Sequence, residues 1–163
     1  MVLKPETFTE QGQEVLASSQ EIIRRYNHSQ WDVEHILLAL LELDNGVPME
    51  VLKLLGLSTD LIKSDLKDVL SKAPKTTYDS AQIYVTPSPQ TFLGNAKAEA
   101  DRFKDEFIGA EHMLIATNRC AMETFQKYSN LMVLIKRKFI KHSQKYVEAT
   151  KLQIHARKAG TNH

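Results

Sequence analysis

Two Glu-His pairs are the residues of this chain whose types and spacing could do chemistry. Glu34-His35 and Glu111-His112 each join a carboxylate to an imidazole, a combination used in acid-base catalysis and in metal binding. Adjacent helical residues project about 100 degrees apart, so the two side chains of one pair do not face a common ligand. We therefore expect no catalytic and no metal site here. Each Glu is expected to complement the positive start of a helix, and each His to pack and hydrogen-bond in the interior.

Other reactive groups are isolated in the sequence. Cys120 is the only cysteine, so the chain has no intrachain disulfide and no cysteine cluster for zinc or iron. It follows Arg119 at an expected helix start, which would lower its pKa, but we interpret it as a buried, unreactive thiol. No nucleophile elbow and no Gly-x-x-x-x-Gly-Lys-Ser/Thr phosphate loop occurs in the sequence. We expect a chain that is not itself an enzyme and uses no cofactor.

The composition is that of a globular protein. The chain has 163 residues, of which 42% are apolar and 25% charged, which fits one or two compact domains. The longest apolar run, Ile36 to Leu41, is far shorter than the roughly 20 residues that cross a bilayer. Residues 1–6 contain no apolar signal core. These features predict no membrane association and a cytoplasmic location.

The elements that must position the Glu-His pairs are amphipathic helices. Apolar spacing predicts a helix after a Thr9 cap, a second after an Asp32 cap, a third that ends at Gly56, and a fourth that begins at Ser58. No stretch alternates with the period of a strand. Residues 73–85 lack helical periodicity and are interpreted as a connector.

The second half of the chain repeats the first. A shift of 77 positions aligns residues 9–39 with eight identities, which are Thr9 with Thr86, Gln13 with Gln90, Leu16 with Leu93, Arg25 with Arg102, Glu34 with Glu111, His35 with His112, Leu37 with Leu114 and Ala39 with Ala116. Farther on the offset is 73, as if four residues were lost from one loop. The duplication predicts an all-α fold of eight helices, in which two four-helix units pack about a pseudo-twofold axis.

The repeats define the expected domain organisation. One domain covers residues 1–143, with repeat one at 8–72, the connector at 73–85, repeat two at 86–143, and a basic tail or linker at 144–163. Residues 136–163 carry eight basic residues against one acid, which leaves residues 1–135 at minus six. A polyanion-binding tail is one alternative, but a solvated basic face or linker is the preferred interpretation. With Tyr146 as its only aromatic residue, the tail gives little support to nucleic-acid recognition.

Several motifs resemble a known family. They are Phe8-Thr9-Glu10, the segment 31–40 (WDVEHILLAL), Val85-Thr86-Pro87, and the segment 107–114 (FIGAEHML). Together they are similar to the paired repeats of the Clp N-terminal domain, which begins Clp ATPases of the ClpB and ClpC types. The resemblance covers residues 8 to about 143. It implies a substrate- or adaptor-receiving module tethered to hexameric AAA+ rings that disaggregate proteins or feed a protease. A stand-alone adaptor is the alternative.

The resemblance also suggests where substrates bind. In relatives resembling ClpC, the matching Glu residues help bind phosphorylated arginine on marked substrates. The candidate substrate-binding residues here are therefore Glu34, Glu111, Gly109, Ala110, Thr9 and Thr86. The family usually starts this helix with Gly-Thr, whereas this chain has Asp32-Val33 and Gly109-Ala110. Since Asp32 places a negative charge where a phosphate would lie, we expect Glu111 to mark the better site, with open first-turn amides beside it.

A domain of the ClpB type would also expose an apolar groove for unfolded segments. The large aromatic candidates are Trp31, Phe92, Phe103, Phe107 and Phe125. Core packing is expected for most of them, and the sequence does not tell which one lines the groove.

Overall fold

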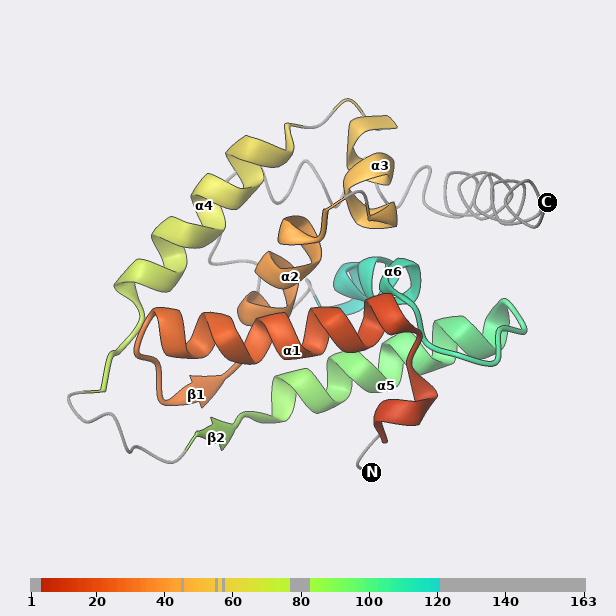
Figure 1. Ribbon diagram of the computed structural model, residues 1–163, viewed down its shortest axis with the longest axis horizontal. Coiled ribbons are helices and arrows are strands. Elements are labelled where there is room, and N and C mark those ends of the chain that lie inside the picture. Colours follow the sequence, from red (N-terminus) through yellow and green to blue (C-terminus); the bar gives the residue numbers. More distant parts are fainter. Residues whose placement is uncertain (1–3, 45, 55, 57, 77–82, 121–163) are drawn as a thin grey trace.

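Helices dominate the part of the chain that the computed structural model describes, residues 4–44, 46–54, 56, 58–76 and 83–120 (Figure 1). The elements in chain order are the 3-10 turn η1 (Pro5–Thr7), α1 (Glu10–Arg25), β1 (Gln30–Trp31), α2 (Val33–Glu42), α3 (Val47–Leu54), α4 (Thr59–Lys72), β2 (Tyr84–Val85), α5 (Pro87–Arg102) and α6 (Ala110–Cys120). The all-α prediction is confirmed. The helices expected beyond residue 120 lie outside the described residues. None of the described helices is long and apolar enough to cross a bilayer.

The predicted helix starts are confirmed. The Thr9 hydroxyl accepts a hydrogen bond from the Gly12 amide at 3.1 Å, and the Ser58 hydroxyl accepts one from the Leu61 amide at 3.3 Å. Each satisfies an amide that has no partner inside its helix. Gly56, beyond the end of α3, has φ of 73°. This left-handed conformation strains residues with a Cβ atom, which explains the glycine.

The core is centred on α2. Nine of its ten residues are buried, and the helix contacts α1, α3, α4, α5 and α6. An apolar helix that is buried on all sides acts as the central rod of a small domain. Phe92 of α5 is fully buried against this core, whereas Trp31 and Phe103 are only partly buried and Phe107 is exposed. Phe125 lies outside the described residues.

The described residues also include a short parallel strand pair, which the sequence analysis did not predict. β1 and β2 pair with Gln30 opposite Tyr84 and Trp31 opposite Val85. Two residues are too few to show a period-2 pattern, so the sequence gives no strand signal here. The end of the segment read as a connector is therefore held against the first repeat.

Backbone contacts between the two halves have equivalent contacts, in which every residue is replaced by its partner at the offset of 77. The Thr9 amide donates to the Ile108 carbonyl at 2.9 Å, and its equivalent, the Thr86 amide, donates to the Trp31 carbonyl at 3.3 Å. Ile108 is itself the equivalent of Trp31. Phe8 also forms a parallel bridge with Ile108, matching the Trp31–Val85 pair. Each half thus lends its leading residues to the start of the other half's second helix, as a twofold arrangement requires.

Candidate functional site

The start of α2 is fixed by a reciprocal cap. The Asp32 carboxylate accepts a hydrogen bond from the Val33 amide at 2.8 Å, and the Asp32 amide donates to Nδ1 of His35 at 3.0 Å. This confirms Asp32 as the cap, and it places the His35 ring in the interior, as expected. The carboxylate lies at the helix start, where it would repel an anion.

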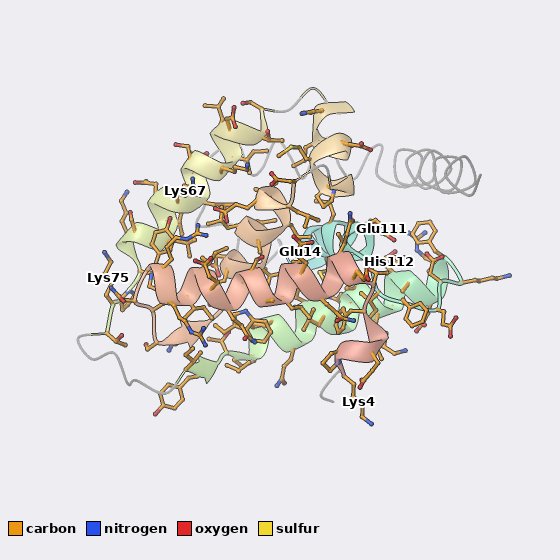
Figure 2. All side chains as sticks on the ribbon, viewed as in Figure 1. Lys4, Glu14, Lys67, Lys75, Glu111 and His112 are labelled. Atoms are coloured by element: carbon orange, nitrogen blue, oxygen red, sulfur yellow. The ribbon has the colours of Figure 1, made fainter. Side chains whose placement is uncertain are left out.

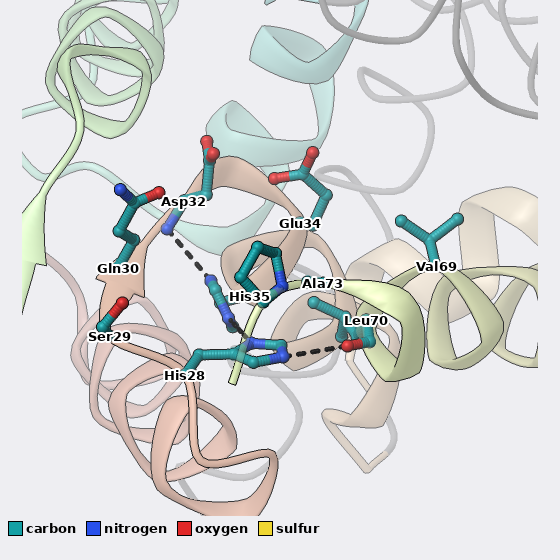
Figure 3. Close-up of a pocket in the computed structure, with 10 residues that line it drawn as sticks. His28, Ser29, Gln30, Asp32, Glu34, His35, Val69, Leu70 and Ala73 are labelled. Atoms are coloured by element: carbon teal, nitrogen blue, oxygen red, sulfur yellow. Dashed lines mark hydrogen bonds between the residues drawn. The ribbon is translucent and has the colours of Figure 1, made fainter. Parts of the chain in front are cut away.

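The His35 ring continues into a chain of hydrogen bonds (Figure 3). Because a backbone amide only donates, Nδ1 of His35 accepts, and its hydrogen is on Nε2. Nε2 donates to Nδ1 of His28 at 2.8 Å, and Nε2 of His28 donates to the Leu70 carbonyl at 2.8 Å. Both imidazoles are therefore neutral. The chain ties the start of α2 to the end of α4.

The acidity of these two rings agrees with this pattern. Burial, with the neighbouring His28 as a second cause, lowers the pKa of His35 to about 4. Burial also lowers the pKa of His28. A proton added to either ring would place two N–H groups face to face. The pair borders a cavity of about 230 Å³ between α2 and α4, which Asp32, Glu34 and Pro74 also line.

The second repeat keeps this arrangement with one replacement. The Gly109 amide donates to Nδ1 of His112 at 2.8 Å, and Nε2 of His112 donates to the Asp105 carboxylate at 2.8 Å. Asp105 is the equivalent of His28 under the shift of 77. The sequence analysis did not single it out, although the repeat alignment over residues 9–39 already places Asp105 opposite His28. In both Glu-His pairs the His is thus part of the helix cap and holds its helix start.

A metal site has to be tested at α6, because Asp105, Glu111 and His112 can bring one ligand atom each within 4.8 Å of one another. Nδ1 of His112 already accepts from the Gly109 amide, so Nε2 carries the hydrogen that points at Asp105. The ring then has no lone pair for an ion at that position. The hydrogen bonds of His112 therefore do not fit a metal ligand, and we assign no metal site to Asp105, Glu111 and His112.

The candidate residues from the sequence fall into two groups that cross between the repeats. Thr9 lies beside Ile108, next to Gly109, Ala110 and Glu111 at the start of α6. In the other group, the Thr86 hydroxyl donates to the Trp31 carbonyl at 3.1 Å, beside the start of α2 that carries Glu34. Each threonine thus lies near the start of the helix that carries the glutamate of the opposite repeat.

The two glutamates differ in their surroundings. Glu34 is buried, whereas Glu111 is partly exposed at the start of α6, beside His112 (Figure 2). A Cβ atom built on Gly109 would lie 2.5 Å from Oε2 of Glu111, so this carboxylate fills the space that a side chain would take. The Gly109 amide is bonded to His112, and the Glu111 carboxylate lies over the glycine, so the Gly109 amide itself is not open.

Cys120 is the last described residue of α6, and the helix start expected after it lies outside the described residues. The basic residues 136–163 lie outside the described residues.

A groove between α1 and α5 is a large apolar feature of the described surface. Its volume is about 630 Å³, within the usual range for ligand sites. The described residues that line it are Pro5, Phe8, Gln13, Leu16, Ala17, Gln20, Trp31, Val85, Gln90, Leu93 and Gly94, none of them charged. Trp31 is held by a hydrogen bond from its indole N–H to the Ser19 hydroxyl at 3.1 Å. Of the aromatic candidates named from the sequence, Trp31 lines this groove, and Phe8, which was not among them, lines it as well.

Fold and groove together define a double-repeat helical domain with an apolar surface channel. Residues 7–128 match the family described as the Clp repeat (R) N-terminal domain, and the chain belongs to this family. Chaperone protein ClpB 1 of Synechocystis sp. is 35% identical over 111 residues, which are 68% of this chain and 12% of that protein. The chain thus spans about one eighth of the length of this curated relative.

Solved structures share the fold at low sequence identity. The N-domain of ClpV from Vibrio cholerae superposes with a TM-score of 0.69 at 17% identity, covering 91% of this chain and 92% of that chain. A complex of the ClpV N-domain with a VipB peptide gives 0.62 at 16% identity, covering 91% and 94%. These similarities establish the architecture.

Proposed function

We propose that this domain receives polypeptides for an ATP-driven Clp unfoldase or disaggregase, by holding unfolded or tagged segments, or an adaptor, in the groove between α1 and α5. The observation that carries the proposal is the uncharged apolar lining of this groove. Apolar side chains of a partner that enter it leave water, which favours binding without any covalent step.

The similarities support a receiving role. A ClpV N-domain has been seen with a peptide of VipB, and that property belongs to ClpV. The match to about one eighth of a ClpB chaperone makes AAA+ ring modules the proposed partners of this chain. The domain itself is proposed to be non-catalytic, to need no cofactor and to work in the cytoplasm.

Filling the groove tests the proposal. Gly94 lines it in the middle of α5, and a Cβ atom added there meets nothing within 4 Å. Gly94→Leu should therefore fold normally and obstruct the groove. Trp31 is the single tryptophan of the chain and lines the groove, so its fluorescence reports binding of a tryptophan-free peptide. We expect an apolar, uncharged peptide to change the Trp31 emission of the wild-type chain, and Gly94→Leu to weaken binding about ten-fold or more.

Ser64→Leu is the matched control. It adds the same side chain at an exposed position of α4, outside the groove lining, and should leave binding unchanged. Circular dichroism verifies that both variants keep the helical fold. An unchanged affinity in Gly94→Leu, or an equal loss in Ser64→Leu, would contradict the groove as the binding site.

A further inference from the structure

The lining of the groove is arranged in symmetric pairs. Eight of its eleven lining residues form four pairs at the offset of 77, namely Phe8 with Val85, Gln13 with Gln90, Leu16 with Leu93, and Ala17 with Gly94. Two pairs are identical, and a third joins the two smallest residue types. In sequence order, each half therefore contributes the same four types of lining residue: an apolar residue, an amide, a leucine and a small residue.

The two halves face each other in opposite directions. α1 and α5 run antiparallel on either side of the groove (Figure 1). The hydrogen bonds that hold the two ends are equivalent, from Thr9 to Ile108 at one end and from Thr86 to Trp31 at the other. A half-turn that exchanges the repeats therefore returns the groove nearly onto itself. A ligand that is reversed in the groove meets the same types of groups in the same order.

No described lining residue fixes a direction by charge. A polypeptide has a direction because its peptide groups point donors and acceptors in a set order, and an ion pair at one end of a site would select one direction. The lining has no charged residue. Its polar groups are side-chain amides, and an amide offers both a donor and an acceptor, so Gln13 and Gln90 can bond a peptide group of either direction. Gln13 uses one amide hydrogen on the Phe8 carbonyl at 3.2 Å, which leaves its oxygen and second hydrogen.

We propose that the groove binds an uncharged, apolar segment of an unfolded polypeptide in both chain directions. The inference rests on the groove being the binding site. The occupant is uncharged because the described lining offers no compensating charge, and a buried charge without a partner is costly. Because two of the four pairs are identical, and because the Gln13 and Gln90 amides can bond a peptide group of either direction, the two orientations of the bound peptide should differ in population by about ten-fold or less. Phe8 against Val85, and Gln20 and Trp31, whose equivalents are not among the described lining residues, account for the remaining difference.

The test labels the peptide at one end and observes both ends of the groove. The probe is a peptide rich in Leu and Val with blocked termini, carrying a nitroxide on a cysteine at either its first or its last position. The full chain is labelled with nitrogen-15, and the broadening of amides near Phe8 and near Val85 is measured by NMR. We expect either label to broaden both ends, at a stoichiometry of one peptide per chain.

Two variants calibrate the experiment. Gln13→Glu and Gln90→Glu each place one charge on one side of the groove, and a version of the peptide with a single terminal lysine should then adopt one direction. The direction should be opposite in the two variants. This confirms that the label distinguishes the orientations and that the equivalence of the two sides is functional.

The outcomes separate this inference from the proposed function. If the first-position label broadens only one end of the wild-type groove and the last-position label only the other, the groove is directional and the inference is wrong, while the proposed function stands. Two peptides per chain, each in one direction, would also overturn it. If no groove amide responds to the peptide at all, the proposed function fails as well.

Discussion

Gly12 of α1 offers a sharp test of the contact between the repeats. A Cβ atom at this buried position would lie 2.7 Å from the carbonyl oxygen of Ile108 and 3.2 Å from Cβ of Phe8. That carbonyl accepts the hydrogen bond from the Thr9 amide, so Gly12→Ala has to displace backbone that joins the two halves. The substitution also raises helix propensity, so its two effects oppose each other.

The steric effect is the larger. Alanine in place of glycine inside a helix stabilises by about 1 kcal/mol. Overpacking against backbone costs about 1–3 kcal/mol, and loss of one hydrogen bond about 1 kcal/mol more. We therefore expect Gly12→Ala to lower the free energy of unfolding by about 1–3 kcal/mol. Gly94→Ala, where an added Cβ atom meets nothing within 4 Å, should raise it by about 0.5–1 kcal/mol.

Urea unfolding, followed by circular dichroism, measures both variants. The same chemical change on α1 and on α5 should move the midpoint in opposite directions, with the slope unchanged. A Gly12→Ala chain as stable as the wild type would refute the reasoning, because the approach of Ile108 to α1 would then be loose enough to absorb a methyl group. A destabilised Gly94→Ala would contradict the open space at that position.

Three further predictions follow from the caps and the repeat contacts. Because the pKa values of His28 and His35 are lowered in the folded chain, the unfolded chain binds more protons below about pH 6.5, and the free energy of unfolding should fall from there toward about pH 4. In urea unfolding measured at each pH, the double variant His28→Gln/His35→Gln should show a flatter dependence on pH. An equally steep dependence would show that other groups cause the loss. Residues 1–76 expressed alone should unfold at a lower temperature and less cooperatively than the whole chain, because they lack the pairings to Val85 and Ile108; equal melting would show two independent domains. If a guanidinium binds at the start of α6, Glu111→Ala should weaken binding of an arginine-phosphorylated peptide about ten-fold or more and Glu34→Ala less, as followed by NMR titration, and equal losses would show that the Asp32 cap does not rank the sites.

Much of the local structure could be predicted because it depends on neighbours in sequence. Thr9, Asp32 and Ser58 are helix caps as expected, since each serves amides within three residues of itself. The left-handed Gly56 is likewise a local property. The interior position of His35 and His112 could also be predicted, because each lies on the apolar face of its helix, where a buried imidazole has to form hydrogen bonds.

What the sequence did not reveal depends on residues far apart in the chain. The hydrogen bond from His28 to Leu70 and the strand pair at Trp31 and Val85 join segments that no periodicity links. The groove is instructive, because the identities of Gln13 with Gln90 and of Leu16 with Leu93 were visible in the repeat. They were interpreted as evidence of duplication. Only the arrangement of α1 beside α5 shows that these pairs line one surface.

The position of the Glu111 carboxylate at the start of α6 depends on the absence of a side chain at Gly109, which the sequence alone does not show. The carboxylate of Glu111 rests where a side chain at position 109 would project. A scan of residue types alone describes Gly109-Ala110 as an open helix start. In the folded chain the carboxylate of Glu111 takes up that space beside Gly109.

The exchange of leading residues between the halves has a consequence for synthesis on the ribosome. Thr9 emerges early, but its backbone partner Ile108 is made roughly 100 residues later, a delay on the order of 5–20 s. During that interval the buried face of α1 around Gly12 has no covering, and neither does the central helix α2 where it will meet α5 and α6. A domain proposed to receive unfolded chains would itself spend its first seconds as one, and a nascent-chain arrest series would place the onset of its protease resistance after residue 108.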